Sequence, residues 1–142
     1  MRAKKEGIAL THLKLQKLVY ILHGWHLAKF GKPLIDEAPQ AWKYGPVIKS
    51  LYHALKIHAS LRITRPIELR RSGVFEIPYI PEKYAQTLDY LNTVWDAYKH
   101  ATAAQLIEVT HKDGTPWHGV YRPNAENLAI SDNAIQAYYR NL

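Results

Sequence analysis

Histidines are the first residues in this chain whose type and spacing could support chemistry. His23 and His26 lie three positions apart, which would place both side chains on neighbouring surface of a helix. With a third ligand such as His12 or Asp36, they could hold a metal ion. The chain has no HExxH motif and no cysteine. His26 also falls beside an apolar stripe, where a hydrogen-bonded core histidine is the favoured interpretation. We therefore expect no metal and no cofactor.

The sequence gives little indication of catalysis by a serine nucleophile or by paired carboxylates. A nucleophile needs an adjacent base and a group that orients that base. None of the four serines stands in a nucleophile elbow: Ser50, Ser60, Ser72 and Ser131. Asp36 and Glu37 are only neighbours in a polar link, and the 7 glycines are scattered rather than gathered in a phosphate-binding loop. We predict a binding protein rather than an enzyme, with a hydrolase that uses histidines as an alternative hypothesis.

One segment combines residue types that are common at protein interfaces: Trp42-Lys43-Tyr44-Gly45-Pro46. Trp and Tyr are frequent interface anchors. Pro46 suits the first turn of a helix, whose free N–H groups can hold a carboxylate or phosphate. The segment could therefore form an exposed aromatic and basic ridge at a helix N-terminus. Alternatively, Trp42 and Tyr44 fix the preceding link onto the core while Gly45 and Pro46 begin the helix.

The other candidate partner-binding residues are cationic or aromatic. Lys14 and Lys17 are three positions apart and could extend the basic surface, or could be an ordinary solvated helix face. Trp117, which follows Pro116, could belong to the core or to an interface. Several arginines surround an expected hairpin and could contact phosphates or an acidic protein: Arg62, Arg65, Arg70 and Arg71.

The positive charge of the chain is concentrated in its first half. Residues 1–71 hold 14 Lys and Arg against 4 Asp and Glu, a net +10, whereas residues 72–142 carry a net −3. A basic half can steer an acidic protein, RNA or DNA. The absence of cysteine fits a reducing cytoplasm, and lysines interrupt the nearest apolar run, so we expect a cytoplasmic protein without a signal peptide or membrane span.

The apolar spacing predicts a mainly α protein. Thr11 is expected to cap a first helix and Gly31 to end it. Gly45-Pro46 is expected to begin a second helix. Residues 82–100 carry the clearest amphipathic pattern. The sequence of residues 102–105 (TAAQ) matches a capping box, which predicts another helix start.

The remaining segments complete a small helical fold. Ser72-Gly73 separates two short alternating stretches, which favours a small β-hairpin near residues 62–80. Ser131 can cap a final helix, and residues 1–9 look like a loose lead-in. We therefore expect a compact bundle of five to six helices that forms a single domain, residues 1–142.

Four short sequence blocks, with aromatic residues and glycines at characteristic positions, are distributed along nearly the whole chain. They are Leu13–Tyr20 with Gly24–Leu27; Gly31–Leu34 with Ala41–Val47 and Tyr52; Leu106 with Thr110-His111, Pro116-Trp117 and Tyr121; and Ile130-Ser131 with Ile135 and Tyr138-Tyr139. In their order and spacing, these blocks resemble the Panacea domain, the family of SocA-like and GepA-like phage-associated antitoxins.

This resemblance implies an antitoxin that neutralises a cognate protein toxin, usually by direct binding. At least one relative acts instead as an adaptor that delivers its toxin to a protease, so a protease is an alternative partner. Some members carry an added DNA-binding segment, for which we expect no room in this chain. A basic nucleic-acid-binding protein is the alternative that the charge distribution leaves open.

Overall fold

The computed structural model describes residues 2–58, 61–66, 69–71, 74–76 and 80–142, with backbone alone for 69–71 and 74–76. Within this part of the chain the fold is mainly helical, as predicted. In order, the elements are α1 (Arg2–Lys5), α2 (His12–Phe30), β1 (Gln40–Trp42), β2 (Gly45–Val47), α3 (Lys49–Leu55), the 3-10 turn η1 (Lys56–His58), β3 (Leu69–Arg71), β4 (Val74–Glu76), the 3-10 turn η2 (Glu82–Tyr84), α4 (Ala85–Tyr98), α5 (Ala103–His111), α6 (Pro116–Val120) and α7 (Asp132–Arg140).

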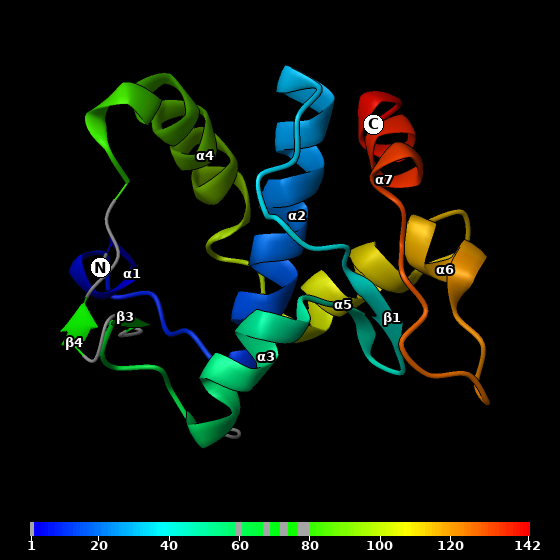
Figure 1. Ribbon diagram of the computed structural model, residues 1–142, viewed down its shortest axis with the longest axis horizontal. Helices are drawn as coiled ribbons and strands as arrows, with labels where there is room; N and C mark the ends of the chain where they lie inside the picture. The colour runs from blue at the N-terminus through cyan, green and yellow to red at the C-terminus, as the bar shows by residue number, and fades with distance from the viewer. Residues whose placement is uncertain (1, 59–60, 67–68, 72–73, 77–79) are drawn as a thin grey trace.

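Helix α2 is the central element against which the other helices pack. The Thr11 side chain accepts a hydrogen bond from the Lys14 backbone N–H, and Gly31 ends the helix in the left-handed conformation at φ 67°. Both ends therefore lie where the sequence predicts them. Helices α4 and α7 flank α2 on opposite sides, and α5 packs near its N-terminal half (Figure 1).

The contact between α2 and α7 depends on a glycine. A Cβ atom on Gly24 would lie 2.3 Å from Cε2 of Tyr139, so the buried tyrosine ring occupies the space that any other residue would need. The same ring meets Trp25 edge-on, with ring centroids 5.4 Å apart. Gly24 therefore fixes how closely the last helix approaches the central one.

A buried histidine joins α2 to α7 and to the loop that follows α2. His23 Nδ1 accepts hydrogen bonds from the backbone N–H groups of Leu34 and Ile35, at 3.2 and 3.4 Å. Its Nε2 therefore carries the proton and donates to Asp132 Oδ1 at 2.9 Å. Burial lowers the pKa of His23, an effect that the Asp132 carboxylate opposes. This imidazole is a neutral structural link between three segments.

The expected hairpin near residues 62–80 is present as the antiparallel pair β3 and β4. The prediction that residues 1–9 form a loose lead-in is wrong. They include α1, whose Ala3 is buried in the core and whose Arg2 guanidinium pairs with Asp96 of α4 at 2.8 Å. The apolar stripe of the expected helix is only partly buried. Tyr84, just before α4, and Leu88, in its first turn, are exposed.

The prediction of a helix beginning at Gly45-Pro46 is also wrong. These residues begin strand β2, in which Pro46 faces Ala41 of β1, and the helix starts later, at Lys49. Gly45 has φ +99°, which lies outside the helical region. Contacts with α2 determine the backbone conformation there, and they outweigh the preference of proline for the first turn of a helix.

Candidate partner-binding site at the first hairpin

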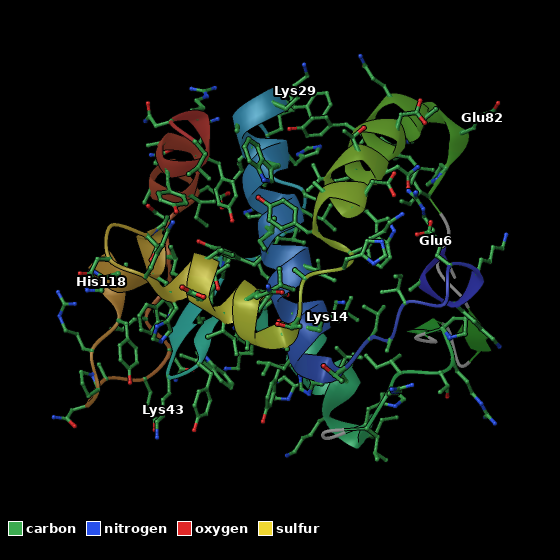
Figure 2. The ribbon with its side chains drawn as sticks, turned by 180° about the vertical axis from the view of Figure 1, so that it is seen from behind. Glu6, Lys14, Lys29, Lys43, Glu82 and His118 are labelled. Carbon is green, nitrogen blue, oxygen red and sulfur yellow. The ribbon has the colours of Figure 1, made fainter. Side chains whose placement is uncertain are left out.

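Strands β1 and β2 form a tight hairpin whose two turn residues point to solvent. Trp42 faces Gly45 across the ladder, which leaves Lys43 and Tyr44 as the turn. The Tyr44 side chain is 63% exposed. Lys43 Nζ lies 5.4 Å from the centroid of the Tyr44 ring, within cation–π range. Lys43 stands at the outer end of the hairpin and points away from the body of the protein (Figure 2).

Two buried polar side chains of α2 hold strand β2. The Gln16 amide donates to the Ile48 carbonyl oxygen at 3.1 Å and accepts from the Ile48 N–H at 3.0 Å, as a neighbouring strand would. Lys17 Nζ donates to the Pro46 carbonyl oxygen at 2.8 Å. Both side chains are buried. Because buried polar groups are costly without partners, these bonds specify where the hairpin sits on α2.

Lys17 also explains the glycine in the hairpin. A Cβ atom on Gly45 would lie 3.0 Å from both Cε and Nζ of Lys17, and the positive φ of Gly45 already disfavours other residues. The Lys17 side chain is 0% exposed. Burial in this position disfavours the ammonium form and lowers the pKa of Lys17 to about 7.

Helices α5 and α6 hold the other strand at the point where it enters the turn. Trp117 Nε1 donates to the Trp42 carbonyl oxygen at 2.7 Å, and His111 Nε2 donates to the Lys43 carbonyl oxygen at 3.2 Å. The rings of His111 and Trp117 stack with centroids 3.6 Å apart. The turn is thus anchored from both sides, so its exposed side chains stand on a fixed backbone.

The candidate binding residues now divide into exposed and supporting positions. Lys43 and Tyr44 are exposed and Trp42 is half-buried, whereas the supporting positions are buried: Lys17, Gly45, Pro46 and Trp117. The buried residues therefore support the hairpin instead of forming its exposed surface. The exposed aromatic and basic residues lie on a β-turn, not at the N-terminus of a helix.

Lys14 and Lys17 form neither of the two surfaces considered for them, a basic binding surface or a solvated helix face. Lys17 points into the protein, and Lys14 is half-buried with its Nζ donating to the Lys99 carbonyl oxygen at 2.7 Å, just beyond α4. A lysine stem can cross apolar surface to reach a carbonyl at a helix end, which spacing alone does not reveal. The side chains of Arg70 and Arg71 lie outside the described part of the structure.

A groove of about 510 Å³ lies beside the hairpin, between the start of α2, the turn and α3. We call it the hairpin groove. Leu13, Lys43 and Tyr44 stand at its edge. Its wall is a run of three rings, in which Tyr52 lies 5.0 Å from His12 and 4.9 Å from Trp42 between ring centroids. Sequence reasoning did not predict His12, Leu13 and Tyr52 as partner-binding residues, because only the fold brings them beside the hairpin.

His26, the second histidine considered as a metal ligand, has a structural hydrogen-bond partner. His26 is buried and its Nδ1 donates to the Lys32 carbonyl oxygen at 2.8 Å, which confirms the interpretation as a hydrogen-bonded core histidine. Among the described residues, no three His, Asp or Glu side chains are grouped to hold a metal ion. No helix in the described ranges is long and apolar enough to cross a membrane.

The fold and this site define a helical protein that presents an aromatic, cationic turn on an anchored hairpin. Comparison with known families assigns residues 15–118 to the family described as antitoxin SocA-like, Panacea domain. Antitoxin SocA of Caulobacter vibrioides (strain NA1000 / CB15N) is 29% identical over 144 residues, covering 98% of this chain and 77% of that relative. This chain belongs to the SocA-like antitoxin family with a Panacea domain. No solved structure matches it.

Proposed function

We propose that this protein is a cytoplasmic antitoxin that neutralises a cognate protein toxin by binding it directly, with the Lys43-Tyr44 turn in the interface. Membership of the antitoxin family supports a toxin as the partner. The observation that carries the rest is the exposed Tyr44 ring on a hairpin that α2, α5 and α6 hold in place. An exposed side chain on an anchored backbone loses less conformational entropy on binding than one on a mobile loop.

This function requires no catalysis by the chain. The buried side chains of Gln16 and Lys17 hold the hairpin, and His23 links the loop after α2 to the start of α7. Neutralisation would depend on a specific complex, which is expected to bury at least about 1,000 Å² in total.

The test is co-expression with the neighbouring gene whose product arrests growth when expressed alone. We expect this chain to restore growth and to co-purify with that product, in hosts with and without the main ATP-dependent proteases. Rescue that requires the proteases would instead support the adaptor route. No co-purification together with salt-sensitive binding to oligonucleotides would support the nucleic-acid alternative.

The chain contains a closely matched control for the role of the turn. Lys83 and Tyr84 are also sequence neighbours, with Lys83 Nζ 5.0 Å from the Tyr84 ring centroid and the Tyr84 side chain 48% exposed. We expect Tyr44→Ala to weaken toxin binding about tenfold or more, the effect of removing a tyrosine that anchors an interface. Tyr84→Ala should leave it unchanged. Equal effects of the two substitutions would remove the turn from the interface.

A further inference from the structure

The hairpin groove combines apolar edges with one exposed cation, Lys43. Leu13 is 38% and Tyr44 63% exposed, and both border the groove. Lys43 stands at the rim, Lys17 lies beneath the surface and His12 forms part of the wall. No Asp or Glu lines the groove among the residues that the structure describes.

We propose that the hairpin groove receives an acidic segment of the toxin, with one apolar side chain inserted between Leu13 and Tyr44. This inference rests on the proposed function and adds the chemistry of the bound segment. An apolar side chain would cover the exposed edges of Leu13 and Tyr44, and burial of such surface favours association. Carboxylates that flank it would meet the exposed Lys43, whereas a basic segment would meet a like charge there.

Two other parts of the described surface carry carboxylates beside aromatic or apolar residues. A hollow of about 450 Å³, which shares Trp42 and Lys43 with the hairpin groove, has Glu126 in its lining. Exposed apolar residues at the start of α4, Tyr84 and Leu88, are accompanied by the carboxylates Glu82 and Asp89. Unlike these two regions, the hairpin groove joins exposed apolar edges with a lining that lacks a carboxylate.

Two leucines allow a matched test of the apolar part. Leu13 and Leu88 lie near the starts of helices α2 and α4, and are 38% and 37% exposed. The toxin-gene product would be titrated with wild type, Leu13→Asp and Leu88→Asp, after thermal unfolding shows that both variants are folded. We expect Leu13→Asp to raise Kd by about tenfold or more and Leu88→Asp to leave Kd within about twofold.

The charge of the bound segment is tested by a matched pair of lysines and by photocrosslinking. At low salt, Lys43→Glu should slow association with the toxin, whereas Lys83→Glu should not. A photoreactive phenylalanine in place of Leu13 should crosslink to a toxin segment that is net acidic and carries an apolar side chain.

The outcomes separate the groove from the proposed function. A stable complex in which Leu13→Asp and Leu88→Asp bind equally, or a crosslink to a basic segment, would overturn the groove assignment and leave direct neutralisation intact. If wild type forms no complex with a toxin that it nevertheless neutralises, the proposed direct binding fails, and the groove assignment fails with it.

Discussion

The buried amine of Lys17 predicts that this protein becomes more stable as the solution becomes alkaline. In the folded chain the pKa of Lys17 is lowered to about 7, against an ordinary value of 10.5. Between these two values the unfolded chain retains a proton that the folded chain has lost. The free energy of unfolding therefore rises with pH, by up to about 1.4 kcal/mol per pH unit. Integrated from about pH 7 to about pH 9.5, the gain is about 3 kcal/mol, or about 10 °C in Tm for a chain of this size.

The assay is urea unfolding of wild type and Lys17→Met across that pH range. Methionine keeps an apolar stem in the same space and removes the amine. We expect the unfolding free energy of wild type to rise with pH and that of the variant to change much less. The comparison cancels other groups that titrate in the same range. Parallel curves for the two proteins would mean that Lys17 keeps its proton in the folded state, and would refute the reasoning.

Two further predictions concern the packing and the histidine link. Gly24→Ala should destabilise the protein by about 1–3 kcal/mol, because its methyl group collides with the Tyr139 ring. The helical control Gly119→Ala, whose added Cβ would meet nothing within 4 Å, should be neutral or stabilising by up to about 1 kcal/mol in thermal unfolding. Because burial lowers the pKa of His23 below its ordinary 6.5, the unfolded chain takes up a proton that the folded chain resists, so stability should fall on acidification below that value. Acid unfolding of His23→Gln should depend less steeply on pH, and an unchanged profile would place the acid sensitivity elsewhere.

Local signals predict the helix ends of this protein well. Thr11 caps α2, and Gly31 ends it with a positive φ. Thr102 and Gln105 form the reciprocal capping box at the start of α5. Each of these signals acts within a few residues of the helix end that it specifies, so the sequence carries the full information.

The first hairpin could not be predicted because its position depends on distant residues. Gly45-Pro46 fits a helix start by local preference, but Gln16 and Lys17 bind the backbone of residues 46–48 across about thirty positions of sequence. For the same reason, the sequence suggested Lys17 as a surface cation although it is a buried anchor. Lys43 and Tyr44 were predicted as binding residues from residue type alone, and the structure shows that both are exposed. The groove beside them could be found only from the fold.

A calorimetric titration of the purified toxin-gene product with this protein, in the absence of any protease, tests the central claim most directly. The account predicts a saturable complex of fixed stoichiometry, loss of toxin activity at the same molar ratio, and weaker binding for Tyr44→Ala than for Tyr84→Ala. Full toxin activity at saturating concentrations of this protein, without detectable heat of binding, would contradict neutralisation by direct contact.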